Sequence, residues 1–380
     1  MPTDPPRPIR VLVVDDSALM RKLLRALLEA DGTIEVVGTA QDPFEAREKI
    51  KALDPDVITL DIEMPKMDGL TFLRNLMRLR PMPVVMVSSL TERGADATLA
   101  ALELGAVDFV PKPKLDLADG LEALAQVLIE KIKAASVARP SVRRRAEPGD
   151  AGAIGGSATA TVTAPVAAGR ARRTITEIGT TDRLIAMGSS TGGTEAVAEI
   201  LAGFPADAPA VVIAQHIPEV FSRRWAARLD AGSAIAVAEA ADGDQILIGH
   251  AYVAPGGRHL RVERSGAKYF CRVGDDPPVN RHRPSVDVLF QSVAAEVGPS
   301  AVGVILTGMG ADGAEGLAEM ARRGSPTVAQ DRATSVVWGM PGEAVRRGAA
   351  EEVLPLAEIG PRVLGLARAP VRKGPRGGTS

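Results

Sequence analysis

The sequence predicts a two-domain α/β protein, with a doubly wound parallel sheet in each domain. Its 380 residues are about twice the usual size of one domain. Short apolar runs alternate with helical patterns on both sides of a central segment, and that small and polar segment has no apolar periodicity. We therefore predict a first domain over residues 1–133, a flexible linker over 134–182, a second domain over 183–370 and a disordered tail over 371–380.

Five apolar runs in the first domain have the length and composition of buried parallel strands. They are Val11–Val14, Ile34–Val37, Val57–Leu60, Val84–Val87 and Val107–Val110. Between the first two runs, apolar residues from Met20 to Leu28 recur at helical spacing, and Ser17 is placed to cap that helix. Five strand–helix repeats of this kind predict a parallel (βα)5 sheet covered by helices on both faces.

The second domain resumes the same alternation after the linker. Its predicted strands are Leu184–Met187, Val211–Ala214 and Val302–Leu306, and its predicted helices are Thr194–Leu201, Glu219–Leu229 and a helix from Ala314. Between Gln245 and Val273 the runs are short and are divided by Pro255-Gly256-Gly257 and Ser265-Gly266. This stretch predicts β-hairpins inserted into or beside the sheet.

The composition excludes several classes of protein. Lysine and arginine number 45 against 47 aspartates and glutamates, and aromatic residues make up 3%, so we expect no nucleic-acid partner. Cys271 is the single cysteine, which excludes an intramolecular disulfide and fits a reducing compartment. The start MPTDPPRPIR lacks the apolar core of a secretory signal, and the uncharged stretch 151–169 is poor in large apolar residues. We expect a cytoplasmic protein with no membrane insertion.

Acidic residues follow two of the predicted strands in the first domain. Asp15 and Asp16 come after the first strand and Asp61 after the third, while Ser88 ends the fourth and Lys112 follows the fifth. Ligands of parallel sheets bind at the carboxyl ends of strands, and converging carboxylates bind hard divalent cations such as Mg²⁺. A carboxylate beside such a cation, opposite a lysine, is arranged to accept a phosphoryl group. The alternative is that these acids cap helices or solvate loops.

Four segments together resemble the receiver domain of bacterial response regulators: VLVVDDSALMRKLL, ITLDIEMPKMDGLTFL, VVMVSSLT and GAVDFVPKP. The resemblance extends from about Ile9 to Lys133. It implies that Asp61 accepts a phosphoryl group from a histidine kinase and that Lys112 contacts this group. It also implies that Ser88 and Phe109 relay phosphorylation to the distal face. The implied Mg²⁺ ligands are Asp15, Asp16, Asp61 and the backbone carbonyl of Glu63.

A serine in the second domain has the surroundings of a nucleophile. Ser190 stands in a Gly-x-Ser-x-Gly turn between a strand and a helix, where the N–H of Thr191 could stabilise an oxyanion. His216 follows the next strand and could serve as a general base. Asp312 lies in a glycine-rich turn after another strand and could orient that histidine. A Gly/Ser loop before a helix binds phosphate at least as often, and the order Ser–His–Asp differs from that of α/β-hydrolases.

A competing interpretation treats the second domain as a dinucleotide-binding module. Gly308, Gly310 and Gly313 form a GxGxxG pattern after a strand, and Asp331 follows about 20 residues later. This fingerprint normally opens the fold in its first βα unit, whereas here it comes late. A second alternative is a non-enzymatic adaptor controlled by the first domain, although no basic stripe or helix-turn-helix pattern is present outside the linker.

Five segments of the second domain resemble the catalytic domain of the chemotaxis protein-glutamate methylesterases: IAMGSSTGGTEAV, VVIAQHIPEVFSRRWAARLD, AYVAPGGRHL, NRHRPSVDVLFQSVA and VILTGMGADGAEGL. The resemblance implies the catalytic triad Ser190, His216 and Asp312, and oxyanion donors at Thr191 and Met309. It further implies hydrolysis of glutamate methyl esters on methyl-accepting chemoreceptors, deamidation of some receptor glutamines, a chemotaxis histidine kinase as phosphodonor and no cofactor for the ester chemistry. A tethered receiver can cover an active site at high effective concentration, so we expect phosphorylation of Asp61 to regulate the esterase.

The other histidines have less defined roles. We expect His250 and His259 to be structural or surface residues. His282 lies between Arg281 and Arg283, and these cations either face an anionic substrate helix or are simply solvated surface residues.

Overall fold

The computed structural model describes residues 7–64, 67–89, 91–112, 118–138 and 183–370. Most of the predicted linker, from residue 139, and the predicted tail lie outside the described residues. The last helix of the first domain continues to Val137, past the predicted end of that domain at residue 133. No helix of the described segments is long and apolar enough to cross a membrane.

The first domain is a five-stranded parallel sheet with strand order β2-β1-β3-β4-β5. Its elements are β1 Ile9–Val14, α1 Ala18–Glu29, β2 Ile34–Ala40, α2 Pro43–Leu53, β3 Val57–Asp61, α3 Gly69–Leu79, β4 Val84–Ser88, α4 Glu92–Glu103, β5 Asp108–Pro111 and α5 Ala118–Val137. All five predicted strands are present, and the direction of winding reverses between β1 and β3. The carboxyl ends of these two strands therefore flank the crevice where such sheets bind ligands.

Both faces of this sheet are covered by helices, as its apolar runs predict. Val11 and Val13 of β1 lie in one buried cluster with residues of α1 and α5, whereas Leu12 and Val14 lie in another with residues of α2 and α3. This alternation follows the two-residue period of a strand whose two faces are both buried. The hydroxyl of Ser17 accepts a hydrogen bond from the Met20 N–H and caps α1, as expected from the sequence.

The second domain contains a seven-stranded sheet of order β14-β13-β12-β6-β7-β9-β8 in which every pairing is parallel. Its elements are β6 Leu184–Ser189, α6 Gly193–Ala202, β7 Ala210–Gln215, α7 Glu219–Gly232, β8 Ala236–Glu239, β9 His250–Val253, β10 His259–Ser265, β11 Lys268–Gly274, α8 Val286–Glu296, the 3₁₀ turn Gly298–Ser300, β12 Ala301–Ile305, α9 Ala314–Arg322, β13 Thr327–Gln330, α10 Met340–Arg346, β14 Glu352–Leu354 and α11 Leu356–Arg368. The winding reverses between β6 and β12, so the predicted doubly wound fold is confirmed in both domains.

The region between Gln245 and Val273 divides into two parts. Strands β10 and β11 form the expected antiparallel hairpin in a sheet of their own. Strand β9, in contrast, joins the main sheet between β7 and β8. The short strands β8, β13 and β14 were not predicted from the sequence.

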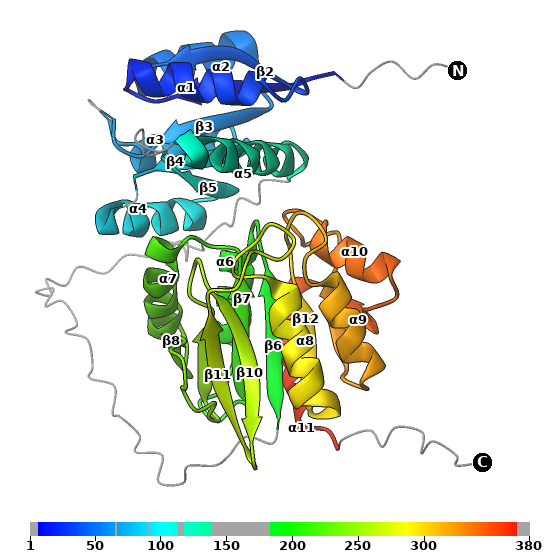
Figure 1. Ribbon diagram of the computed structural model, residues 1–380. Helices are drawn as coiled ribbons and strands as arrows, with labels where there is room; N and C mark the ends of the chain where they lie inside the picture. The colour runs from blue at the N-terminus through cyan, green and yellow to red at the C-terminus, as the bar shows by residue number, and fades with distance from the viewer. Residues whose placement is uncertain (1–6, 65–66, 90, 113–117, 139–182, 371–380) are drawn as a thin grey trace, which may run out of the picture.

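The two domains are packed against each other (Figure 1). Helix α4 of the first domain contacts α7 of the second, where Arg228 pairs with Glu103 and Arg224 lies 3.4 Å from Asp96. The Phe109 ring of β5 lies 4.4 Å, centroid to centroid, from the Phe221 ring of α7. The α4–β5–α5 side of the first domain therefore faces the carboxyl-terminal end of the second sheet.

Candidate functional site

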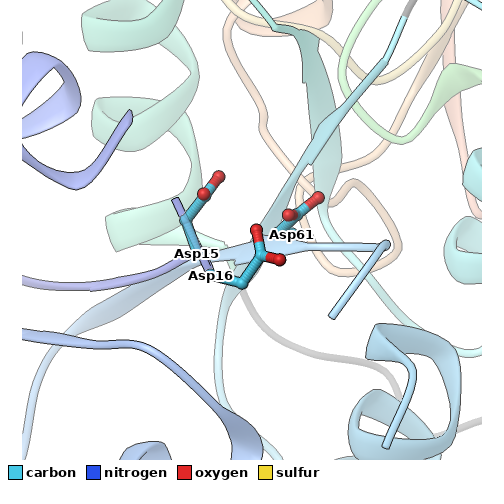
Figure 2. A group of neighbouring side chains, drawn as sticks. All are labelled: Asp15, Asp16 and Asp61. Atoms are coloured by element: carbon cyan, nitrogen blue, oxygen red, sulfur yellow. The ribbon is translucent and has the colours of Figure 1, made fainter. Parts of the chain in front are cut away.

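The structure brings three carboxylates together at the switch point of the first sheet. Asp15 and Asp16 directly follow β1, and Asp61 ends β3 (Figure 2). One carboxylate oxygen from each lies within 4.8 Å of those of the other two. Asp15 and Asp61 are buried, whereas Asp16 is exposed.

Lys112 completes this acidic pocket from the strand end of β5. Its Nζ donates a hydrogen bond of 2.7 Å to Asp61 Oδ2 and lies 3.2 Å from Asp15 Oδ2. Burial raises the pKa of Asp61 to about 6, with a further contribution from the charge of Asp15, while Lys112 acts in the opposite direction. Burial likewise raises the pKa of Asp15. Burial alone would lower the pKa of Lys112, but the two carboxylates outweigh it and hold that pKa above its usual value.

The chemistry of this pocket fits a hard cation and a transferable phosphoryl group. Asp15 Oδ2 is buried and accepts no hydrogen bond from the described residues, although it faces Lys112. The N–H of Glu63 donates to Asp61 Oδ1 at 3.2 Å, so the backbone of Glu63 passes beside the cluster. A carboxylate set of this composition is typical of sites that bind Mg²⁺ through oxygen.

The two other receiver residues singled out from the sequence lie between this pocket and the second domain. Ser88 is buried at the end of β4, and its hydroxyl donates to the Gly94 carbonyl at the start of α4 at 3.2 Å. Phe109 is buried on β5 against Phe221 of the second domain, with Lys131 Nζ 5.2 Å from its ring centroid. The pocket, Ser88 and Phe109 thus lie on strands β3, β4 and β5, which are neighbours in the sheet.

Ser190 lies at the switch point of the second sheet, in the turn between β6 and α6. Its N–H donates to the Thr307 carbonyl after β12 at 3.0 Å, and its carbonyl accepts a 2.9 Å hydrogen bond from Nε2 of Gln215, the last residue of β7. The turn closes through Gly192, whose φ of 78° is a conformation that L side chains rarely adopt. Three adjacent strands therefore fix the backbone of Ser190.

His216 and Asp312 form a direct pair beside this turn. His216 Nε2 lies 2.8 Å from Asp312 Oδ2, and both side chains are buried. The other ring nitrogen, Nδ1, is buried and has no hydrogen-bond partner among the described residues. No hydrogen bond is recorded between Ser190 and His216, but both line the same cavity. The structure therefore brings all three predicted residues to one place and makes the contact between His216 and Asp312.

Asp312 accepts hydrogen bonds from several groups in addition to His216. Its carboxylate also accepts hydrogen bonds from Asn280 Nδ2 at 2.8 Å, the Ser285 hydroxyl at 2.7 Å, and the N–H groups of Val286 and Asp287. Burial alone would raise the pKa of Asp312, but its hydrogen bonds and the neighbouring His216 hold that pKa well below its usual range. This carboxylate is therefore a fixed negative charge.

The residues expected to stabilise an oxyanion are next to Ser190. Thr191 follows it directly, and Met309 lies in the turn after β12. Neither backbone N–H donates a hydrogen bond to any described residue. Both residues line the cavity that contains Ser190 and His216, so two backbone donors without a partner among the described residues lie beside this cavity.

The cavity beside Ser190 has a volume of about 560 Å³, and both domains line it. The first domain contributes Phe109, Pro111, Val127, Glu130 and Lys131. Asp108 of β5 accepts hydrogen bonds from the Thr191 hydroxyl and from Lys131 Nζ, so the first domain directly contacts the residue after Ser190. Glu130 of α5 pairs with Arg281 at 3.1 Å.

The presence of glycine at position 308 is explained by local packing, without a dinucleotide-binding motif. A Cβ on Gly308 would lie 2.8 Å from the Ser190 Cβ and 3.0 Å from the Ser190 N. The turn after β12 therefore needs glycine there to pass the Ser190 turn. The carboxylate of Asp312 is buried among hydrogen-bond donors inside this turn, where a dinucleotide-binding loop would approach a pyrophosphate.

Comparison with known proteins agrees with this arrangement. The family model of the CheB methylesterases matches residues 185–363, and that of the response regulator receiver domain matches residues 11–125. The protein-glutamate methylesterase/protein-glutamine glutaminase 1 of Xanthomonas euvesicatoria is 58% identical over 360 residues, which cover 95% of this chain and 98% of that protein. This chain belongs to the CheB methylesterase family. The predicted resemblance is therefore confirmed for both domains.

Two further family members are also similar over nearly the whole length of this chain. The protein-glutamate methylesterase/protein-glutamine glutaminase of Hydrogenovibrio crunogenus is 50% identical over 374 residues, covering 95% of this chain and 99% of that protein. The enzyme of Hahella chejuensis, protein-glutamate methylesterase/protein-glutamine glutaminase 1, is 55% identical over 350 residues, with coverages of 92% and 94%. The similarity thus includes both domains of these CheB methylesterases in one chain.

Sequence reasoning missed several polar residues of this CheB-type site. Asn280, Ser285 and Gln215 hold Asp312 and the Ser190 turn, and Asp108 reaches Thr191 from the other domain. The segment NRHRPS was part of the resemblance, but no periodicity or strand end in it indicated contact with Asp312. The guanidinium of Arg283 donates to the carbonyls of Asp275 and Asp276 while Arg283 also lines the cavity beside Ser190, so the substrate-facing role stays a prediction.

Proposed function

We propose that this chain hydrolyses methyl esters of glutamate side chains on chemoreceptors, releasing methanol, and deamidates glutamines, under the control of receiver phosphorylation. The supporting observation is that His216, bonded to Asp312, shares a cavity with Ser190, Thr191 and Met309, and that the backbone N–H groups of the last two have no hydrogen-bond partner in the described part of the chain. The names of the relatives state both reactions. Membership of this family, with a receiver domain in the same chain, supports a kinase partner, a receptor substrate and a role in chemotactic adaptation.

The chemistry follows from the orientation of His216. Because Nε2 faces Asp312, the second nitrogen, Nδ1, is the one available to accept the proton of Ser190. Ser190 Oγ attacks the ester carbonyl, and the N–H groups of Thr191 and Met309 stabilise the oxyanion. The imidazolium returns the proton to the departing methanol, or to ammonia when the substrate is a glutamine. Water then hydrolyses the acyl-enzyme to give glutamate.

The acidic pocket of the first domain is proposed to accept the phosphoryl group. Asp61 is the nucleophile, and Lys112, which now pairs with it, would contact the transferred group. Asp15, Asp16, Asp61 and the carbonyl of Glu63 would hold Mg²⁺. This assignment is supported by the convergence of the three carboxylates and by Asp15 Oδ2, which pairs electrostatically with Lys112 but accepts no hydrogen bond from the described residues. When bound, this cation would offset charge on the transferring oxygens.

The contacts between the domains support a regulatory role for the receiver. Asp108, Phe109 and Glu130 lie over the cavity or against residues that line it, so this docked arrangement restricts access to Ser190. Phosphorylation of Asp61 would shift the docking equilibrium through Ser88 and Phe109.

The replacement Ser190→Ala tests the catalytic assignment. We expect it to abolish methanol release from methylated receptor membranes without lowering thermal stability, because a hydroxyl in a loop contributes little packing. Ser300→Ala is the matched control, since Ser300 precedes β12 at the opposite end of the sheet and should leave the rate unchanged. Methanol release above about 5% of the wild-type rate in Ser190→Ala would remove Ser190 from the mechanism.

A further inference from the structure

The segment before α8 forms a tight turn beside the proposed catalytic pair. Val279 and His282 exchange two backbone hydrogen bonds of 3.1 and 2.9 Å, with Asn280 and Arg281 between them. Asn280 has a φ of 52° and Arg281 a φ of 65°. Among the described non-glycine residues, Asp54 is the one other residue with a positive φ. Two adjacent side chains in the left-handed region indicate that the surrounding structure holds this turn in place.

Asn280, the first of the two central residues of the turn, is bonded to two carboxylates through its side chain. Asn280 Nδ2 donates to Asp312 Oδ1 at 2.8 Å and to Asp287 Oδ2 at 2.7 Å, which uses both hydrogens of the amide. Asp287 is itself anchored, because its Oδ1 accepts a hydrogen bond of 2.6 Å from the Gly316 N–H. Asn280 therefore links Asp312 to a fixed point at the start of α8 and separates two buried negative groups.

The last residue of the turn lies on the face of the catalytic histidine. The rings of His282 and His216 are stacked, with centroids 3.7 Å apart and an angle of 13° between their planes. Burial, together with the neighbouring His216, lowers the pKa of His282 to about 3, so this ring is uncharged at neutral pH. A neutral ring in this position restricts rotation of the His216 imidazole without adding a charge that would oppose its protonation.

We propose that Asn280 and His282 are positioning residues for the reaction: Asn280 fixes the carboxylate of Asp312, and His282 fixes the ring plane of His216. This inference rests on the proposed function of Ser190 and His216. The left-handed backbone of the turn brings two side chains to the same catalytic pair. Asn280 contacts Asp312, and His282 contacts His216.

The replacement Asn280→Gly separates positioning from turn formation. Glycine adopts a positive φ without strain, so the turn is retained while the amide is lost. In the full-length chain with phosphodonor and Mg²⁺, we expect kcat for methanol release to fall about tenfold or more, with KM changed by less than about twofold. Asn280→Asp, which keeps the volume but replaces the donor with an oxygen, should lose at least as much. Asp54→Gly, at the third such position, is the control for backbone relief and should keep the wild-type rate.

His282→Ala and His282→Phe test the stacked ring. We expect kcat to fall in His282→Ala and to recover largely in His282→Phe, which retains an aromatic face. The far-downfield NMR resonance of the proton between His216 Nε2 and Asp312 gives a second readout. It should broaden or shift in Asn280→Gly and His282→Ala, and remain in His282→Phe.

These outcomes separate the two proposals. A folded Asn280→Gly or His282→Ala chain with kcat within about twofold of wild type and an unchanged resonance would overturn the positioning role. A wild-type chain that releases no methanol from methylated receptors would instead refute the proposed function. In that case the NMR resonance and the rate at which a fluorophosphonate labels Ser190 still test the positioning role in each variant.

Discussion

Each of the two parallel sheets of this chain has a buried aspartate beside its switch point, and the two aspartates are in opposite electrostatic states. Asp61 ends β3, and Asp312 lies in the turn between β12 and α9. Asp61 of the first domain is buried with one lysine shared between two carboxylates, and its pKa is raised to about 6. Asp312 of the second domain is equally buried, but His216, Asn280, Ser285 and two backbone N–H groups donate to it.

The difference shows how burial is used for two kinds of chemistry. A carboxylate with too few donors gains most from a bound cation or from a new bond at its oxygen, which suits a phosphoryl acceptor. A carboxylate surrounded by donors is held as a permanent anion that orients and charge-stabilises a histidine. The fold supplies the location in both cases, and the neighbouring donors determine the function.

Removing the charge of Asp312, the aspartate surrounded by hydrogen-bond donors, should have the largest effect on the rate of methanol release. In Asp312→Asn, an amide replaces the acceptor of His216 Nε2–H, so we expect kcat for methanol release to fall by about 10³ to 10⁴. Asp331→Asn is the control, because Asp331 is the acid that the dinucleotide interpretation would have used and it bonds to Thr334 instead. Loss of methanol release in Asp331→Asn, with activity retained in Asp312→Asn, would reverse the assignment.

Removing the charge of Asp61, the aspartate with few hydrogen-bond donors, should stabilise the protein. At neutral pH without Mg²⁺, we expect Asp61→Asn to raise the free energy of unfolding by about 1–3 kcal/mol, because a carboxylate with a raised pKa is destabilising when ionised. Urea unfolding in a chelator measures this. The exposed neighbour provides the control, and Asp16→Asn should change the value by less than about 0.5 kcal/mol. A lower free energy of unfolding in Asp61→Asn would mean that the attraction between Asp61 and Lys112 outweighs the cost of burying the Asp61 carboxylate.

The two carboxylates should also give stability opposite dependences on pH. The pKa of Asp61 rises on folding from 3.8 to about 6, so its contribution falls as the pH rises through this interval. The pKa of Asp312 falls on folding, so its contribution is present above 3.8 and is lost as the pH falls below that value. Chelator-treated wild type and Asp61→Asn should therefore differ in the slope of unfolding free energy between pH 4 and about 6. Identical slopes in this range would contradict the raised pKa of Asp61.

The smallest expected effect is at the contact between the domains. Glu130 is half-buried and Arg281 is exposed, so their pair contributes about 1 kcal/mol or less to docking. Glu130→Ala should raise methanol release without phosphodonor by up to about fivefold and leave the phosphorylated rate unchanged. Glu48→Ala, which removes an exposed pair with Lys51 on α2, is the control. A decrease in the basal rate would show that Glu130 does not restrict access.

The sequence was informative wherever a functional side chain follows a buried strand. Asp15 and Asp61 directly follow an apolar run, Ser190 and His216 directly follow the strands β6 and β7, and parallel strands bring such positions to one edge. The fold class and the location of the residues on these strands were therefore predictable. The short strands β8, β13 and β14, of three or four residues, carry too few apolar positions for their pattern to be recognised.

Contacts that depend on loop conformation could not be predicted. Asn280 reaches Asp312 because two successive residues adopt a positive φ, which no composition signal indicates for Asn-Arg. His282, considered only for substrate contact, stacks on His216 for the same reason. The bond from Thr191 to Asp108 depends on how two separate domains dock, which is not encoded in either domain's periodicity.

Methanol release from methylated receptor membranes, with and without a small phosphodonor and Mg²⁺, tests the central claim most directly. The account predicts release by the wild-type chain that increases with the phosphodonor, no release by Ser190→Ala, and no increase in Asp61→Asn. Release that is the same with and without phosphodonor would contradict the coupling between the two switch points. No release under either condition would contradict the assignment of Ser190, His216 and Asp312.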